Sequence, residues 1–210
     1  MSSQKPASWA YAEDFVTESE AALTARRRGE ELGCAPVGVG VGATLRMVAA
    51  SVGARAVVEI GTGAGVSGLW LLEGMPDDGI LTTIDLEAEH QRAAKEAYAA
   101  AGVAHQRTRV ITGRALDVLD RMTDGAYDLV LVDGDQNEFP AYVTQAGRLL
   151  RSGGVMLVNT MLWRDKVADP AARDDTTRTL RDLGKSLRDD DRFRTNLLPV
   201  GDGLLVAVKR

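Results

Sequence analysis

The chain contains few of the residues that build disulfides, metal centres or nucleic-acid surfaces. Its one cysteine, Cys34, excludes an intramolecular disulfide and is typical of a reducing compartment. It has only two histidines, and its 25 Lys and Arg residues are outnumbered by 30 Asp and Glu residues. A single run of three basic residues, at 26–28, is too short for the positive stripe of a nucleic-acid-binding protein. The composition therefore predicts no nucleic-acid partner.

Long apolar runs are also missing from the sequence. No stretch approaches the about 18 apolar residues of a membrane span, and no signal-peptide pattern is present. We therefore expect a cytoplasmic protein without a membrane partner. The hydrophobic content of 45% and the charged content of 26% are ordinary for a globular chain, so residues 1–210 are expected to form a single domain.

Segments with strand periodicity alternate with segments of helical periodicity along most of the chain. Strands are expected at 56–60, 80–85, 108–112, 127–132 and 154–159. Helices are expected at 66–74, 87–101, 115–122, 138–150 and 171–188, with two more, at 8–32 and 40–52, in an N-terminal helical cap over residues 1–52. The connections are short and contain glycine, as at 101–103 and 151–154. The alternation predicts a Rossmann-like core over residues 53–210, with a parallel sheet covered on both faces.

The last residues of the chain break this alternation. Two apolar runs, at 195–200 and 204–208, are separated only by Gly201-Asp202-Gly203. Strands joined by three residues must be antiparallel, because a parallel crossover needs a dozen or more. The sequence therefore predicts an α/β fold with a doubly wound, mostly parallel seven-stranded sheet that ends in an antiparallel hairpin. This layout is typical of class I S-adenosylmethionine (SAM) methyltransferases, whereas a dinucleotide-binding fold would end in another parallel crossover.

Three alternating glycines, Gly61, Gly63 and Gly65, follow directly after the strand at 56–60. A strand that stops in a glycine turn and restarts as a helix lets backbone N–H groups approach a ligand closely. Asp85 ends the next strand, at the spacing of a ribose-binding carboxylate. These features predict a nucleotide-type cofactor site.

The glycines Gly63-x-Gly65-x-x-Gly68 also match the pattern of dinucleotide-binding proteins. An NAD-dependent oxidoreductase is therefore an alternative to a methyltransferase. In that pattern the first glycine follows the strand directly and the third lies five residues later. Here the first glycine is Gly61, and Val66 lies five residues on. Glu59 instead completes the Glu-x-Gly-x-Gly-x-Gly pattern of SAM methyltransferases.

From about residue 36 to its end, the chain resembles small O-methyltransferases of the catechol and caffeoyl-CoA type. The resemblance rests on segments in matching order and spacing, at 57–67, 83–87, 101–103, 113–119, 127–133, 153–154, 162–163 and 198–203. It implies SAM as methyl donor, S-adenosylhomocysteine (SAH) as product, a small-molecule acceptor and a homodimer. It also implies cofactor contacts from Val37, Glu59, Gly61, Thr62, Gly63, Gly65, Ser67, Asp85, Leu86, Gly113, Arg114, Ala115 and Asp133. Asp85 would bind the ribose, Arg114 and Ala115 would flank the adenine, and Glu59, Gly61 and Ser67 would line the methionine end.

The sequence departs from these relatives where their metal and catalytic base lie. They bind a divalent metal through one Asp after the fourth strand and an Asp-Asn pair after the fifth, with a Lys three residues beyond the first Asp. Here the first Asp is Asp133, but the Lys position is Gln136 and the pair is Asn159-Thr160. Because Mg²⁺ favours carboxylate oxygens, no metal site is expected. A rearranged site that uses Asp135 and Glu138 stays open as an alternative.

Ionising a phenol of pKa near 10 at pH 7 costs about 4 kcal/mol, which a metal or Lys would ordinarily supply. Asp133 is therefore the candidate general base. An acceptor that is already acidic and needs only alignment, or a SAM-binding protein without activity, are the alternatives. Gln136, Asn159, Thr160 and Trp163 are expected near the acceptor, with Trp163 either stacking on it or packing in its loop.

Two further groups of residues have no assigned chemistry. His90 is expected on the polar face of the helix after Asp85 and His105 in the loop before the third strand, so both are expected on the surface, away from the mouth of the site. Trp9, Tyr11 and Phe15 would form a lid, a dimer contact or an N-terminal helix packed on its own domain.

Overall fold

Seven strands form one mixed sheet in the computed structural model, which describes residues 5–210. They are β1 (Ala56–Ile60), β2 (Ile80–Asp85), β3 (Thr108–Thr112), β4 (Tyr127–Val132), β5 (Leu150–Val158), β6 (Phe193–Leu198) and β7 (Leu204–Lys209). The order across the sheet is β3-β2-β1-β4-β5-β7-β6. Strands β1 to β5 pair in parallel, whereas β7 runs antiparallel between β5 and β6. The predicted parallel sheet with a C-terminal hairpin is confirmed.

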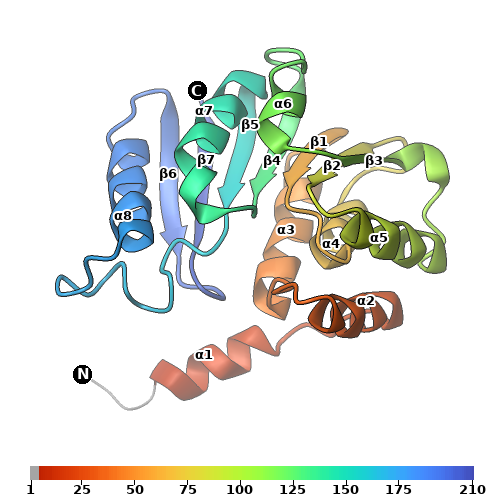
Figure 1. The fold of residues 1–210 in the computed structure, drawn as a ribbon, viewed down its shortest axis with the longest axis horizontal. Helices are drawn as coiled ribbons and strands as arrows, with labels where there is room; N and C mark the ends of the chain where they lie inside the picture. The colour runs from red at the N-terminus through yellow and green to blue at the C-terminus, as the bar shows by residue number, and fades with distance from the viewer. Residues whose placement is uncertain (1–4) are drawn as a thin grey trace.

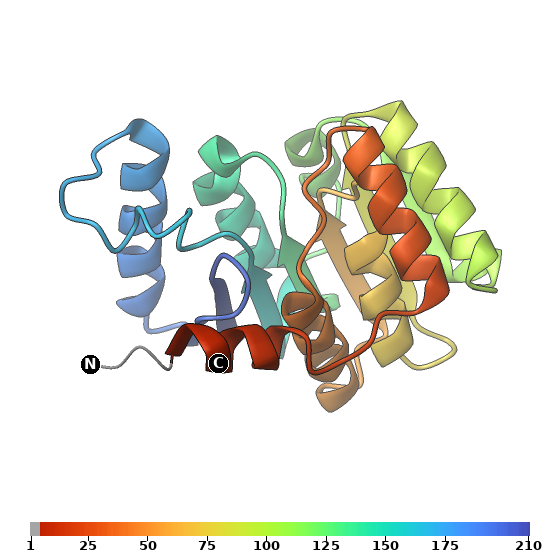
Figure 2. The same ribbon diagram turned by 90° about the horizontal axis from the view of Figure 1, so that it is seen from below.

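Helices cover both faces of this sheet (Figures 1 and 2). They are α1 (Lys5–Glu13), α2 (Glu20–Glu31), α3 (Val39–Ser51), α4 (Val66–Gly74), α5 (Ala88–Ala100), α6 (Ala115–Leu119), α7 (Phe139–Leu149) and α8 (Asp175–Arg188), with 3-10 turns η1 (His105–Arg107) and η2 (Gln136–Glu138). Helices α2 to α5 pack on one face, and α6 to α8 pack on the other. Among the described residues, no helix has the length and apolar character that crossing a bilayer requires.

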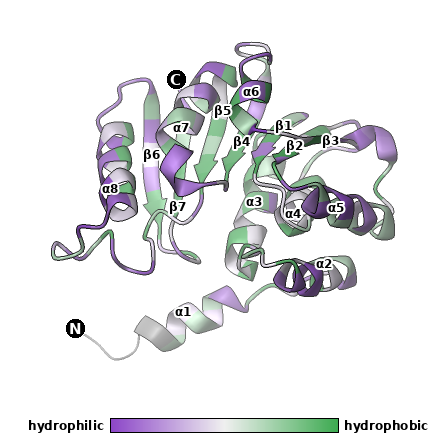
Figure 3. Cartoon of the chain, in the orientation of Figure 1, coloured by the Kyte–Doolittle hydropathy of each residue, from purple (hydrophilic) through white to green (hydrophobic). Residues whose placement is uncertain are grey.

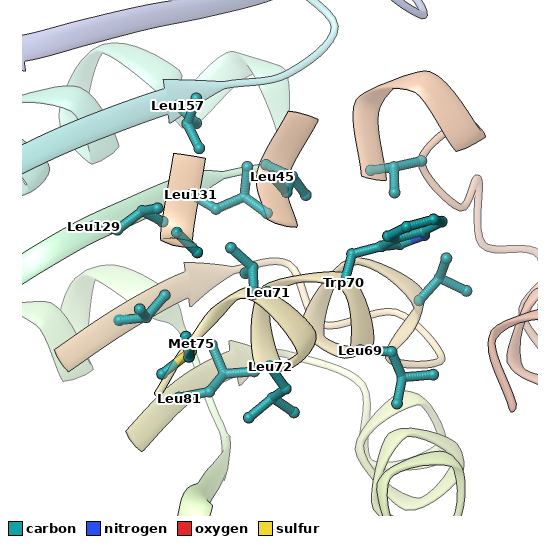
Figure 4. Packing of buried hydrophobic residues seen from close by; sticks show 14 of the residues in the cluster. Leu45, Leu69, Trp70, Leu71, Leu72, Met75, Leu81, Leu129, Leu131 and Leu157 are labelled. Carbon is teal, nitrogen blue, oxygen red and sulfur yellow. The ribbon is translucent and has the colours of Figure 1, made fainter. Parts of the chain in front are cut away.

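The central strands bury both of their faces, because consecutive side chains point to opposite sides of a strand. Val57 contacts the cluster under α3 and α4, and Val58 contacts the cluster under α7. Figure 3 shows hydrophobic residues concentrated in these strands and polar residues on the outer helix faces. In Figure 4, Leu71 of α4 and Leu45 of α3 lie next to Leu131 of β4, and all three are fully buried. The rigid layer so formed holds the strand ends in place.

The expected helix at 8–32 is wrong, because the structure divides it into α1 and α2. The division has a local cause at Ser19, whose side chain accepts a hydrogen bond from the Ala22 N–H and caps α2. Glu18 turns inward, where its carboxylate binds the Arg26 guanidinium at 2.6 and 2.8 Å. The serine cap and the ion pair beside it therefore begin a new helix at Glu20.

Two other expected boundaries are also wrong. The helix expected at 171–188 begins at Asp175, because Asp174 caps it by accepting from the Thr177 N–H and hydroxyl. The glycine connection expected at 151–154 is part of β5 instead. An irregular register against β4 absorbs it, with Gly153 at φ +76°.

Candidate functional site

A cavity of about 430 Å³ opens where β1, β2 and β4 end. In a doubly wound sheet such a crevice forms where neighbouring crossovers leave in opposite directions, here between β1 and β4. Its walls come from the segment before α3 and from the loops after β1, β2, β3 and β4: Cys34–Val37, Ile60–Ala64, Val66, Ser67, Ile84–Leu86, His90, Gly113–Ala115, Asp133–Asp135, Glu138 and Tyr142. The volume lies within the range of about 300–1,000 Å³ that ligand pockets span.

The glycine loop brings β1 against β4 at the floor of this cavity. Gly61 has φ +93°, and a Cβ at this position would lie 2.3 Å from the backbone carbonyl oxygen of Asp133. Any side chain would therefore separate the two strand ends. Gly63 then donates its N–H to Asp85 Oδ2 at 2.9 Å, which fixes the loop to the end of β2.

Asp85 is held in place by three donors. Besides the Gly63 N–H, its carboxylate accepts from the Glu87 N–H at 2.9 Å, and His90 Nδ1 lies 3.2 Å from Oδ1. An ionised carboxylate offers about four acceptor positions, so capacity remains for a ligand. The expectation that His90 lies away from the site is wrong: it lines the cavity, because α5 starts three residues after β2. His105 is exposed, as expected.

Two of the expected cofactor residues do not reach the cavity. The Glu59 side chain is fully buried behind the wall, where it accepts from the hydroxyls of Ser67 and Thr83 at 2.5 and 2.6 Å. Gly65 faces α5 instead, since a Cβ there would lie 3.1 Å from Ala94. The glycine pattern alone does not show which glycine contacts a ligand and which allows two elements to pack closely. The tertiary structure shows that Gly65 serves the packing of α5.

A side-chain network that the sequence did not reveal closes one end of the cavity. Glu138 accepts from Arg114 Nη2 at 3.0 Å and from the Tyr142 hydroxyl at 2.5 Å. Burial and the neighbouring Glu138 raise the pKa of Tyr142 above its usual range. Asp135 is occupied as the cap of η2, accepting from the Asn137 N–H. Within residues 5–210, no three His, Cys, Asp or Glu side chains group closely enough to hold a metal ion.

Asp133 and Asn159 form the one polar pair at the ends of β4 and β5 in the described part of the chain. Asn159 Nδ2 donates to Asp133 Oδ1 at 2.9 Å. Burial raises the pKa of Asp133 to about 7, and the amide opposes that rise. The Asn159 Oδ1 atom is buried and has no hydrogen-bond partner among the described residues. A buried acceptor without a donor is costly, so a donor from a bound molecule would satisfy it.

The four residues expected near the acceptor, Gln136, Asn159, Thr160 and Trp163, do not line the cavity. Of these, Asn159 contacts its wall through Asp133. Gln136 starts η2, and Thr160 begins a loop with unusual backbone angles. Trp163, Arg164 and Asp165 are consecutive residues with φ of +49°, +55° and +63°. Hydrogen bonds hold this left-handed turn: the Leu162 and Arg164 N–H groups donate to Asp202 in the hairpin turn.

The same loop is fixed from its other side by Arg181 of α8. Its guanidinium donates to the carbonyl oxygens of Lys166, Val167, Asp169 and Ala172. A strained backbone conformation is kept only where many surrounding contacts enforce it, and such residues are frequent at ligand sites. The loop that follows Asn159 is therefore held in one conformation by hydrogen bonds, although most of its side chains are exposed.

Replacing Thr160 by Asn should stabilise the protein. Thr160 has φ +61°, which a β-branched residue rarely adopts and which Asn tolerates. We expect the free energy of unfolding to rise by about 1 kcal/mol in urea titrations. The control is Thr108→Asn in β3, where φ is −127° and we expect a loss of about 0.5 kcal/mol. Equal changes in the free energy of unfolding for the two substitutions would show that the backbone at Thr160 is not strained.

Comparisons with known proteins define the class of this enzyme. A family model described as O-methyltransferase matches residues 9–210. A curated Mycobacterium ulcerans protein, whose name assigns it to the O-methyltransferases, is 49% identical over 200 residues, covering 95% of this chain and 89% of the relative. A crystal structure from Corynebacterium glutamicum has a TM-score of 0.90 at 32% identity, covering 98% and 96% of the two chains. The O-methyltransferase TomG of Streptomyces achromogenes has a TM-score of 0.86 at 31% identity, covering 100% and 99%.

The chain belongs to the O-methyltransferase family. The predicted resemblance, the predicted fold and the predicted class of enzyme are thereby confirmed. The oxidoreductase alternative is not supported.

Proposed function

We propose that the chain transfers the methyl group of SAM to a hydroxyl group of a small-molecule acceptor and releases SAH. The cavity at the ends of β1, β2 and β4 carries the proposal, because it combines a glycine loop, a held carboxylate at Asp85 and further acidic side chains among apolar ones. TomG was solved in complex with SAM, which supports the same donor here. Bound SAM would supply a methyl group activated by the positive charge of its sulfur.

The lining residues suit the parts of this cofactor. The free acceptor capacity of Asp85 suits ribose hydroxyls, and the backbone after β3, at Gly113–Ala115, suits the adenine edge. Thr62, Gly63 and Ser67 would face the methionine part, with Val37 opposite and Leu86 at the exposed rim. The acidic side chains in the lining suit the positive charge of the SAM sulfur, and this match of charge is the observation that supports SAM as the ligand of the cavity.

Asp133 would act as the general base without a metal. Its pKa of about 7 lets it accept a hydroxyl proton near neutral pH, and the Asn159 amide steadies the carboxylate. The unpartnered Asn159 Oδ1 would accept from the same acceptor molecule. Thr160, Trp163 and Gln136 would shape the outer part of this acceptor site. A SAM-binding protein without activity remains the second candidate, because the Lys and the Asp-Asn pair of the relatives are absent.

The single cysteine and the exposed aromatic residues near the N-terminus bear on where the protein is found and how it assembles. We expect residues 1–210 to act as one methyltransferase domain in the cytoplasm, in keeping with the single cysteine. The aromatic side chains of Trp9, Tyr11 and Phe15 are 54%, 71% and 72% exposed, so packing on their own domain does not explain them. They favour a homodimer contact through α1 and the residues that follow it, and light scattering that gives the mass of one chain would exclude such a dimer.

Calorimetric titration with SAH tests the proposed cofactor and metal requirement together. We expect SAH to bind with equal affinity in excess Mg²⁺ and in EDTA, and NAD⁺ not to bind. Mg²⁺ binding beside bound SAH would mean that Asp133 recruits new ligands and would contradict metal independence. No binding of SAH would overturn the proposed function.

A further inference from the structure

Glu59 is a buried carboxyl group without a countercharge. It is 0% exposed, and its two oxygens accept hydrogen bonds only from the hydroxyls of Ser67 and Thr83. Within residues 5–210, no Lys, Arg or His forms an ion pair with it. Burying an unpaired charge is costly, and burial accordingly raises the pKa of Glu59 to about 7, against the opposing effect of the two hydroxyls.

Every element packed around Glu59 presents a neutral or an acidic group to it. Ser67 comes from α4, Thr83 and Asp85 come from β2, and Asp133 follows β4. Tyr98 of α5 also lies close, and its hydroxyl has no hydrogen-bond partner among the described residues. Asp85 and Asp133 favour the protonated form of Glu59 by repulsion. Among the described residues, hydroxyl groups are therefore the only side-chain groups near Glu59 that would stabilise a negative charge.

The carboxyl group lies directly behind the wall of the proposed cofactor cavity. Ser67 lines that cavity, and its hydroxyl is 2.5 Å from Glu59 Oε1. Four acidic side chains also line it, whereas its basic residues, Arg114 and His90, already lie against Glu138 and Asp85. Charges interact strongly where water is largely excluded, so a bound cation would lower the pKa of Glu59 and favour its ionised form.

We propose that Glu59 is the countercharge of the sulfonium group and distinguishes SAM from SAH by its protonation. Glu59 loses its proton to solvent when SAM binds. Methyl transfer breaks the C–S bond, forms the C–O bond and leaves a neutral thioether, while the acceptor proton goes to Asp133. Glu59 then regains a proton from solvent. This inference rests on the proposed function, since it assigns SAM to the cavity.

Proton release during calorimetric titration tests this role. The full chain is titrated at pH 6.5 with SAM and with SAH, in two buffers of different ionisation enthalpy. Glu59→Gln and Asp133→Asn are the matched variants, because both remove a buried carboxyl group of raised pKa. The amino group of the ligand titrates equally with every variant, so comparison between variants removes its contribution.

We expect SAM to release about 0.8 proton more from the wild type than from Glu59→Gln, because that fraction is protonated at pH 6.5 for a pKa of about 7. SAH should release the same number from both. Asp133→Asn should keep the extra release. The ratio of SAM to SAH affinity should fall about tenfold from pH 8 to pH 6 in the wild type, relative to Glu59→Gln.

Thr83→Val supplies a variant that keeps the carboxyl group. It removes a hydrogen bond that lowers the pKa of Glu59, so the midpoint of the affinity ratio should move to higher pH. Extra release that persists in Glu59→Gln, or that disappears in Asp133→Asn, would overturn the inference. Absence of binding by both ligands would overturn the proposed function itself, which is a separate result.

Discussion

Gly61→Ala should strongly weaken cofactor binding and strongly destabilise the fold. The backbone at Gly61 has φ +93°, and an added Cβ would lie 2.3 Å from the Asp133 carbonyl oxygen and 3.1 Å from the Gly134 nitrogen. Backbone atoms cannot move aside as a flexible side chain would. The loop must therefore shift, and the Gly63 N–H leaves Asp85. We expect the free energy of unfolding to fall by about 2–5 kcal/mol, from the left-handed backbone and the overlap together.

The loss of SAH affinity in this variant should be about 100-fold or more, because a displaced loop no longer aligns the cavity wall. Gly53→Ala is the matched control. Gly53 also has positive φ, +56°, but an added Cβ would meet nothing within 4 Å. That control should lose only about 1–2 kcal/mol and keep its SAH affinity. Equal behaviour of the two variants would show that the contact with β4 does not position the loop.

Asp133→Asn should remove most of the methyl transfer while leaving SAH affinity within about threefold of the wild type. The amide cannot accept the hydroxyl proton, and a positioned base is worth about 10²–10⁴-fold in rate. The measurement is transfer of tritium from methyl-labelled SAM to a panel of phenolic acceptors. Asp78→Asn, the same substitution in an exposed turn, is the control and should keep full activity. An unchanged rate in Asp133→Asn would instead favour an acceptor that needs only alignment.

The pH profile gives this prediction a second readout. Because the pKa of Asp133 is raised to about 7, the base form is populated as pH rises through that value. For the wild type, kcat/KM should rise about tenfold per pH unit below pH 7 and level off above it. Asp133→Asn should lose this dependence. A profile that stays unchanged in the variant would assign the titration to another group.

Some of the site was predictable because its signals are local. The register of Gly61 against the end of β1, the place of Asp85 at the end of β2 and the place of Asp133 at the end of β4 follow from the chain alone. A strand, a tight turn and a helix each show their own periodicity over a few residues. Parallel order then brings the carboxyl ends of those strands to one edge of the sheet.

Other parts of the site depend on contacts between segments that are far apart. Glu138 binds Arg114 across 24 residues, and Asp202 fixes the turn at Arg164 across 38. Neither pair has a sequence pattern. The enclosure of the Glu59 carboxyl group by Ser67 and Thr83 depends on such contacts as well, and the sequence did not reveal it.

The sequence by itself determined the alternating α/β fold, the terminal hairpin, the glycine loop and the resemblance to small O-methyltransferases, because each depends on spacing along the chain. Only the tertiary structure decided which polar groups lie together. It buried Glu59 without a countercharge, brought His90 to Asp85, joined Asp133 to Asn159 and held a left-handed turn beside them. Burial and distance set the protonation of these groups, and both are properties of packed neighbours rather than of sequence order.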